Sequence, residues 1–459
     1  MNTVDSEPAH RSAGGMLSGG TARPIFLFAL PIMLGFFFQQ LYITVDAVIV
    51  GRYLGSSSLA AVSVASPILF IVVFFLVGGC TGVSVLAAQI YGSGDRKRLK
   101  EAFATALTAG SVFTVILSAV CLASARSILV WTRAPLELHG ETMAYLAIVF
   151  GGLIFSFLYN CLAAGLRGIG NSRAPFVFQA AASAGHIALN LLFVGALGMG
   201  VRGSAWATVL SQAGSSAACW IYICRRVPLL ALSKRECVPA KWALSKILSY
   251  SWAAAMQSII VYVGRFLTQG CVNPFGAEVI AGYNAATRIE GFVMMPFSGV
   301  STAGATFCAQ NIGAGHAERV KSGFRVSMMM NVAYSVPACI ALWFAAPHVM
   351  TAFVPEGGGG AIIAAGVDYL RFMSLYYTIA AVDEVLQGFF RGIGDFRMTM
   401  YVSFAQIVVR VALSFALVPR VGVSGIAHAT GIGWGLVFFW LSSCVRRRLK
   451  GICAPSGAE

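Results

Sequence analysis

Charged residues are scarce in this chain of 459 residues, since only 11% are Asp, Glu, Lys or Arg. Soluble domains carry roughly 25% charged residues, so the composition excludes an ordinary soluble protein. Hydrophobic residues instead make up 58% of the chain, and the mean hydropathy is +0.78. These values predict an integral membrane protein.

The usual sequence marks of enzymes and ATP-driven pumps are also absent. The chain has no G-x-x-x-x-G-K-[ST], no H-E-x-x-H and no G-x-S-x-G motif. Its eleven cysteines are scattered, without C-x-x-C or metal-like spacing, and are expected to be apolar packing residues. We therefore predict neither an enzyme nor a cofactor. A membrane-bound prenyl or acyl transferase would need acidic or His residues clustered at a surface loop, and the sequence offers none.

Long apolar runs dominate what remains. A helix needs about 20 mostly apolar residues to cross the hydrocarbon layer. Twelve such runs occur, six in each half, near residues 24–50, 57–91, 101–124, 143–166, 174–198, 203–224, 243–271, 277–312, 322–346, 364–390, 398–418 and 423–445.

The basic residues lie mainly on one side of these predicted spans. Of 32 Lys and Arg residues, 23 fall on the side of the N-terminus and 5 in the opposite loops, while Arg265, Arg288, Arg371 and Arg410 fall in or near spans. The positive-inside rule then places both termini in the cytoplasm. Topology and contact with anionic lipid explain the formal charge of +15, and no nucleic-acid partner is needed.

The chain also repeats itself. Four motifs recur in the same order at offsets of 221 to 224 residues. They are the Gly55 and Gly276 regions, A-Q-I-Y-G-S-G at 88 with A-Q-N-I-G-A-G at 309, R-G-I-G at 167 and 391, and G-S-A-W-A-T at 203 with G-I-A-H-A-T at 425. Duplicated helical bundles are typical of secondary transporters, which hold their substrate between the repeats.

The repeat defines the expected architecture: an all-α membrane protein with two six-helix lobes around a central cleft, related by a pseudo-two-fold axis along the membrane normal. The expected boundaries are a disordered cytoplasmic N-terminus at 1–22, an N lobe at 23–224, a linker at 225–242, a C lobe at 243–446 and a cytoplasmic tail at 447–459.

Polar residues inside the first and fifth spans form the main candidate site. Gln39, Tyr42 and Asp46 share one face of a helix, and so do His186 and Asn190. A buried carboxylate binds a proton, or binds Na⁺ together with neighbouring oxygens. Simpler interpretations remain open: Asp46 caps the outer mouth or pairs with Arg52, His186 packs, and Asn190 joins two helices.

The second half carries a different set of charges. Arg265, Glu290, Asp383, Glu384 and Arg410 lie at least partly within spans. Asp383 and Glu384 are consecutive and so point about 100° apart around a helix. Asp383, Glu384 and Arg265 form a second candidate site, with the alternative that one acid pairs with Arg410 or Arg265 to hold helices together.

These features together resemble one known family. The resemblance rests on the twelve spans in two like halves, the stretch V-D-A-V-I-V-G at 45 followed by L-G at 54 and L-A-A-V at 59, A-Q before Gly92, and the paired R-G-I-G motifs. This combination resembles the MATE (multidrug and toxic compound extrusion) family over residues 24–446. M-Q at 256 with Q-G-C-V-N-P-F-G at 269 is similar to its DinF-like branch.

The resemblance implies efflux driven by H⁺ or Na⁺ entry, with rocking between outward-open and inward-open V shapes. Pro31 and Asp46 match the branch's first-helix proline, implicated in bending, and its first-helix aspartate. His186 and Asn190 fall where the branch has Asn and Asp, which leaves Asp46 as the one evident carboxylate and favours a proton shared with His186. The NorM-like branch uses acids of helices seven and ten, but here helix seven has Arg265 and no acid.

The sequence thus predicts a cation-coupled antiporter of a prokaryotic inner or plasma membrane that exports small, cationic organic compounds. A single chain with its own cleft is expected to work as a monomer. The alternative within the same superfamily is a flippase for lipid-linked oligosaccharides or an exporter of metabolites, for which Arg265, Arg288 and Arg410 would hold a diphosphate.

Overall fold

The computed structural model describes residues 15–131, 135–233, 236–353 and 359–453, and these residues form helices and short connections without any strand. The first half contains α1 (Ala22–Gly92), α2 (Arg96–Trp131), η2 (Leu136–Leu138), α3 (His139–Gly151), α4 (Leu153–Gly168), α5 (Arg173–Asn190), the π-helix η3 (Leu191–Ala196) and α6 (Val201–Arg226). The second half contains α7 (Lys241–Val272), η4 (Asn273–Phe275), α8 (Ala277–Gly313), α9 (Ala317–Phe353), α10 (Gly360–Ser374), α11 (Tyr377–Gly392), α12 (Phe396–Val421) and α13 (Ser424–Cys453).

Each predicted span coincides with a helix or a pair of helices. Within the described ranges nine helical segments are long and apolar enough to cross a membrane, and α3 with α4, bent by 42°, forms a tenth. The remaining two predicted spans are the more polar α6 and the pair α10–α11. The chain is a multi-pass membrane protein, as the composition predicts.

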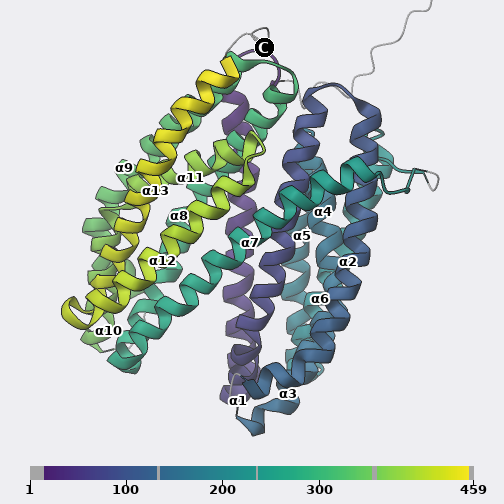
Figure 1. Cartoon of the computed structure of the whole chain (residues 1–459). Helices are drawn as coiled ribbons and strands as arrows, with labels where there is room; N and C mark the ends of the chain where they lie inside the picture. The colour runs from purple at the N-terminus through teal and green to yellow at the C-terminus, as the bar shows by residue number, and fades with distance from the viewer. Residues whose placement is uncertain (1–14, 132–134, 234–235, 354–358, 454–459) are drawn as a thin grey trace, which may run out of the picture.

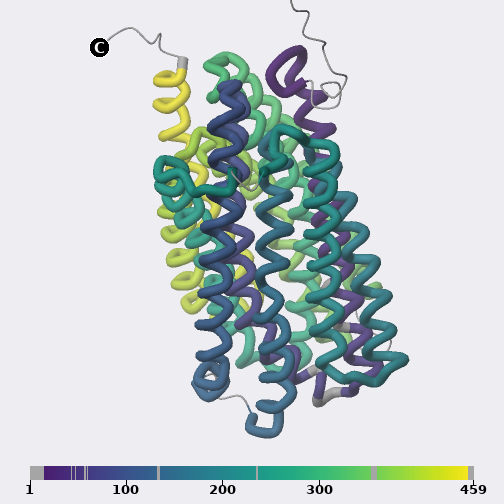
Figure 2. Tube along the Cα trace, turned by 90° about the vertical axis from the view of Figure 1, so that its right-hand side faces the viewer, coloured from purple at the N-terminus to yellow at the C-terminus, as the bar shows by residue number. Residues whose placement is uncertain are grey.

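The helices form two lobes that meet at one end and diverge toward the other (Figure 1). One lobe contains α1 to α6 and the other α8 to α13, while α7 crosses between them. The start of α1 and the end of α13 lie at the same end of the bundle in both views (Figures 1 and 2). Each lobe has its own buried core: one is centred on residues such as Phe103, Leu146 and Phe150, the other on Tyr369, Met373 and Tyr377.

The first two spans form the single element α1, which breaks at Gly55. Gly55 has φ 78° and ψ −173° and lies between the first two predicted spans, while Pro31 lies within helical backbone of the first span. The bending implied for Pro31 by the resemblance stays a prediction. The matching residue of the second half, Gly276, has φ 87° and ψ 170°. Only glycine adopts this conformation readily. The repeated sequence thus produces the same backbone turn in both lobes.

The N-terminal segment differs from its prediction. Residues 1–14 lie outside the described part, but 15–21, which were also expected to be disordered, lie against the C lobe. The Arg319 guanidinium donates hydrogen bonds of 2.6 to 3.4 Å to the carbonyls of Gly15, Met16, Ser18 and Gly19. Four carbonyl acceptors satisfy one half-buried cation of α9, which fixes the segment against the C lobe.

The linker between the lobes lies against the first turns of α2. Glu236 accepts a hydrogen bond from the Ser233 N–H and pairs with Lys100 at 3.1 Å, and these contacts lower the pKa of this carboxyl. Trp242 donates to Glu101 at 2.9 Å. The linker is therefore attached to the N lobe and delivers the chain to the start of α7.

The repeated motifs contact each other where the lobes meet. Gln89 donates to the Gly392 carbonyl at 3.1 Å, and its counterpart Gln310 donates to the Gly168 carbonyl at 2.8 Å. Each bond joins an A-Q motif of one lobe to an R-G-I-G motif of the other. The repeated motifs thus produce a pair of symmetric contacts across the lobe interface.

The glycines of the A-Q motifs bring the two backbones together. A methyl group at Gly92 would lie 1.9 Å from the Gln310 carbonyl oxygen, and one at Gly313 would lie 1.9 Å from that of Gln89. Such separations are far inside van der Waals contact, so only glycine fits. The interface depends on these two residues.

We expect Gly92→Ala and Gly313→Ala each to destabilise the protein by about 1–3 kcal/mol, because the added methyl forces the lobes apart. Thermal unfolding midpoints in detergent measure the effect. Gly435→Ala is the control, since its methyl would meet no atom within 4 Å. Equal midpoints for the Gly92 and Gly435 variants would contradict the interpretation.

Candidate functional site

Asp46, on the first half of α1, lies at the centre of a polar cluster in the N lobe. Its Oδ1 accepts a hydrogen bond from Asn190 Nδ2 at 2.5 Å and one from Ser204 Oγ at 3.1 Å. His186 Nε2 lies 3.7 Å from the same oxygen. Helices α1, α5 and α6 therefore each place polar atoms around one carboxylate.

A second set of contacts surrounds His186. Its Nε2 is 3.2 Å from Thr208 Oγ1, which also lies 3.5 Å from the Tyr42 hydroxyl. The rings of Tyr42 and His186 pack edge to face, with centroids 4.3 Å apart. His186, Thr208 and Tyr42 thus form a second polar group, which adjoins the Asp46 carboxylate through His186.

The cluster is largely closed to its surroundings. The side chain of His186 is 1% exposed and that of Asp46 is 17% exposed. Two buried polar atoms, Asn190 Oδ1 and His186 Nδ1, have no hydrogen-bond partner among the described residues. Unpartnered buried polar atoms are costly, and the Asn190 oxygen can still accept from one more donor or bind a small cation.

Local backbone features bring these residues together. The α-helix α5 ends at Asn190 and widens into the π-helix η3, a form that is frequent at functional sites. Gly200 then reverses the chain with φ 64° and ψ −151°. Ser204 and Thr208 follow one turn apart on α6, so both face the same side.

The structure brings most, but not all, of the predicted residues together. Tyr42, Asp46, His186 and Asn190 converge, whereas Gln39 is exposed and has no recorded contact with them. Within the described ranges Asp46 forms no ion pair with Arg52, so the capping alternative is not supported. Sequence reasoning missed Ser204 and Thr208, although both belong to the G-S-A-W-A-T motif already noted as a repeat.

A comparison with family models decides the affiliation of the chain. The model MatE matches two stretches, residues 31–192 in one lobe and 253–416 in the other. The chain belongs to the MatE family. The resemblance found in the sequence is confirmed, and the two matches agree with the duplication.

Known proteins support this MatE assignment along nearly the whole chain. The probable multidrug resistance protein YpnP of Bacillus subtilis is 27% identical, over 93% of this chain and 94% of its own. An FAD transporter of Shewanella oneidensis is 24% identical, over 74% of this chain and 76% of its own. A crystal structure of MATE in complex with MaL6 has a TM-score of 0.91 at 20% identity and covers 96% of this chain and 99% of that one. This last likeness confirms the predicted fold.

The acidic residues of the C lobe of this MatE protein do not share one environment. Glu384 lies 3.7 Å from Arg391, at the end of the same helix α11. Asp383 points into the lobe, is 1% exposed, and neither of its carboxylate oxygens has a hydrogen-bond partner among the described residues. The predicted alternative that Arg410 or Arg265 pairs with one of them is wrong for Glu384, whose partner is Arg391.

Arg265 and Arg410 belong to a different part of the C lobe. Both lie within electrostatic range of the Tyr283 phenol. Glu290 accepts a hydrogen bond from Tyr369 at 2.8 Å, and the Tyr283 and Tyr369 rings pack 5.0 Å apart. Arg410 is buried and its Nε has no partner among the residues described. The candidate set of Asp383, Glu384 and Arg265 is therefore not a single site.

We expect Ser204→Ala to destabilise the protein, because it removes one of the donors to the Asp46 carboxylate, and hydrogen bonds to charged groups contribute about 1.5–3 kcal/mol. Ser211→Ala is the matched control, since Ser211 lies on the same helix and, within the described part of the chain, bonds to the Thr208 carbonyl and not to Asp46. Unfolding midpoints at neutral pH measure both. A loss as large for Ser211→Ala as for Ser204→Ala would argue against the network.

Proposed function

We propose that this protein exports small organic cations from a prokaryotic cell, across its inner or plasma membrane, in exchange for H⁺ or Na⁺. The observation that carries the proposal is the Asp46 carboxylate inside a membrane-spanning helix, held by Asn190 and Ser204 and close to His186. A carboxylate at membrane depth is costly and marks an ion pathway or proton relay. No cofactor is needed, because the ion gradient supplies the driving force.

The chemistry of the cluster favours a proton over Na⁺. Na⁺, a hard cation, prefers several oxygen ligands, whereas the groups nearest the Asp46 carboxylate are the donors Asn190 Nδ2 and Ser204 Oγ and the His186 nitrogen. The Asn190 amide suits both protonation states, because a flip of the amide offers its oxygen to a protonated Asp46 and its nitrogen to an ionised one.

Transport by alternating access is supported by the way the lobes meet. Their contacts include the reciprocal bonds of Gln89 and Gln310, which join the cytoplasmic end under the proposed topology. The excess of 23 over 5 basic residues on that side supports this orientation. The structure then corresponds to an outward-facing state, and export requires these contacts to open and re-form.

The substrate class rests on the relatives. YpnP and several other relatives carry the name multidrug resistance protein or multidrug export protein. A negative carboxylate and aromatic side chains attract flat, lipophilic cations, and these form the proposed substrate class. Tyr42 supplies one such ring beside Asp46.

A second candidate is export of an anionic metabolite that carries phosphate, or of a lipid-linked oligosaccharide. It is favoured by the buried Arg410, whose Nε is unpaired, and by Arg265 near the same tyrosine. The Shewanella FAD transporter is a relative whose name gives a substrate of this chemistry. Transport of FAD therefore tests this second candidate.

We expect Asp46→Asn to reduce gradient-driven transport to the rate of liposomes without protein, because the amide cannot exchange a proton or balance Na⁺. The assay follows ethidium, and separately FAD, in proteoliposomes under a pH gradient or a Na⁺ gradient imposed one at a time. Ethidium movement with the wild type supports the cation exporter, whereas movement of FAD alone supports the second candidate.

Asp368→Asn is the control, since Asp368 is an exposed carboxylate on α10 in the other lobe. It should retain full transport. Asp383→Asn, tested alongside, separates a C-lobe contribution from the N-lobe site. Full transport by Asp46→Asn would overturn the role of the cluster.

We expect residue 237 to be protected and residue 136 to be labelled when intact cells meet a membrane-impermeant maleimide, because the two lie on opposite sides in the proposed topology. Cys237 lies exposed in the linker, and Leu136 is 84% exposed in η2. Two variants are compared in a cysteine-free background, one keeping Cys237 and one carrying Leu136→Cys. Labelling of Cys237 in unbroken cells would reverse the assigned orientation.

A further inference from the structure

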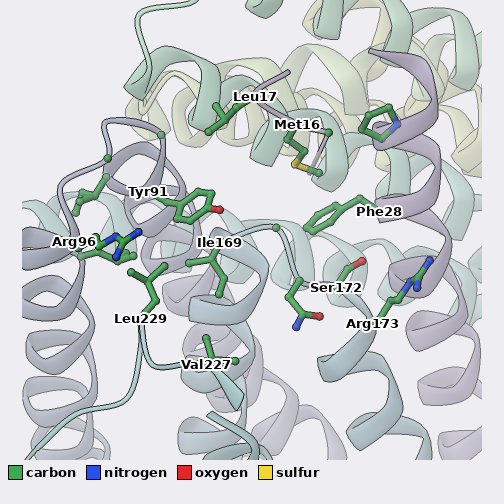
Figure 3. A pocket seen from close by; sticks show the side chains of 18 of the residues that line it. Met16, Leu17, Phe28, Tyr91, Arg96, Ile169, Ser172, Arg173, Val227 and Leu229 are labelled. Atoms are coloured by element: carbon green, nitrogen blue, oxygen red, sulfur yellow. The ribbon is translucent and has the colours of Figure 1, made fainter. Parts of the chain in front are cut away.

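A large basic pocket lies beside the lobe interface, at the end of the bundle where the chain starts and ends. It has a volume of about 1050 Å³ and opens between the N-terminal segment, α1, α2, the α4–α5 turn and α6 (Figure 3). Pockets for small molecules typically span about 300–1,000 Å³. The pocket is therefore large enough to hold a small-molecule ligand.

Four arginines from four different helices line this pocket. They are Arg23 of α1, Arg96 of α2, Arg173 of α5 and Arg226 of α6. Among the described residues none of the four has an ion-pair partner. In Figure 3, Arg96 and Arg173 lie at two ends of the pocket. The four arginines thus surround the pocket with positive charge that no ion pair among the described residues balances.

The other ionic groups of the pocket are already engaged. Asp95 lies 3.5 Å from Arg98 and accepts the Arg98 N–H at 2.9 Å. Lys100 is paired with Glu236 at 3.1 Å. The positive-inside rule explains why basic residues lie on this side, but it does not require them to surround one cavity.

The rest of the lining suits an anion with an apolar part. The first residues of α2 and α5 line the pocket, so the positive ends of two helix dipoles add to the arginines. Apolar side chains complete the wall, among them Met16, Leu17, Phe28, Ile169, Val227 and Leu229 (Figure 3). Basic pockets between membrane helices near the cytoplasmic surface are typical binding sites for phospholipid head groups.

We propose that this pocket binds a phosphate group, carried by an anionic lipid head group or by a soluble phosphorylated compound. Arginine is suited to the role because its planar guanidinium donates two parallel hydrogen bonds to phosphate oxygens. The proposal goes beyond the transport function above and does not depend on it, since the Asp46 cluster contributes no residue to this pocket.

The test measures binding to the full-length protein, purified in dodecyl maltoside, by microscale thermophoresis. One arm titrates dioctanoyl phosphatidylglycerol against dioctanoyl phosphatidylcholine, and the other titrates inorganic pyrophosphate. Saturable binding of phosphatidylglycerol alone assigns the lipid head group, and binding of pyrophosphate shows that free phosphate suffices. Saturation in neither arm overturns the proposal.

The chain offers a closely matched pair of variants. Arg96→Gln with Arg226→Gln removes two pocket arginines, whereas Lys97→Gln with Arg225→Gln removes the adjacent charges, which do not line the pocket. We expect the first pair to weaken binding about tenfold or more and the second to leave it within about twofold. Equal losses for both pairs would show a diffuse charge effect and overturn the proposal.

A single exchange keeps the test decisive if the first pair does not elute as a monodisperse protein. Arg173→Gln is then compared with Arg397→Gln, its counterpart in the other lobe, which lies outside the pocket. Weaker binding only for Arg173→Gln supports the site. Unchanged binding for Arg173→Gln overturns it.

Discussion

The structure depends on one contact in which two backbones meet without side chains between them. Gly92 faces the Gln310 carbonyl and Gly313 faces the Gln89 carbonyl, so the same motif closes the interface from both sides. In a membrane there is no hydrophobic force to join helices, and close backbone approach with polar bonds takes its place. From this contact the lobes diverge toward the other end of the bundle (Figure 1).

The hydrogen bonds of the buried polar side chains offset the cost of burying them. Asp46 is tolerated because Asn190 and Ser204 donate to it, and Gln257 is tolerated because it bonds Gln387 at 2.6 Å and Ser403 at 3.0 Å. Buried polar groups that are left without partners are the exceptions, and such exceptions merit a functional explanation. Asn190 Oδ1, His186 Nδ1 and the Asp383 carboxylate are exceptions of this kind.

Much of this architecture was predictable, because membrane-spanning helices are recognised by their length and apolarity. The duplicated sequence motifs also indicate that the same turns occur in both halves. The pairing of Asp46 with Asn190 followed from helical spacing plus the assumption that α1 faces α5. The roles of Ser204 and Thr208 did not follow, since hydroxyl residues are common in membrane helices and only packing decides which of them face a carboxylate. Spacing predicted that Asp383 and Glu384 point apart, but it did not reveal the partner of Glu384, which is an arginine seven residues along the same helix.

The element that joins these parts is the first half of α1. Near its start Ile25, Phe28 and Ala29 pack against Val300, Ala303 and Phe307 of α8, in the opposite lobe. About five turns later the same helix presents Asp46 to α5 and α6 of its own lobe. Under the proposed mechanism, a change in the charge of Asp46 alters its hydrogen bonds with Asn190 and Ser204, which hold this part of α1 to its own lobe. Because the near end packs against α8 of the opposite lobe, the first half of α1 links the Asp46 cluster to the lobe interface through one continuous helix.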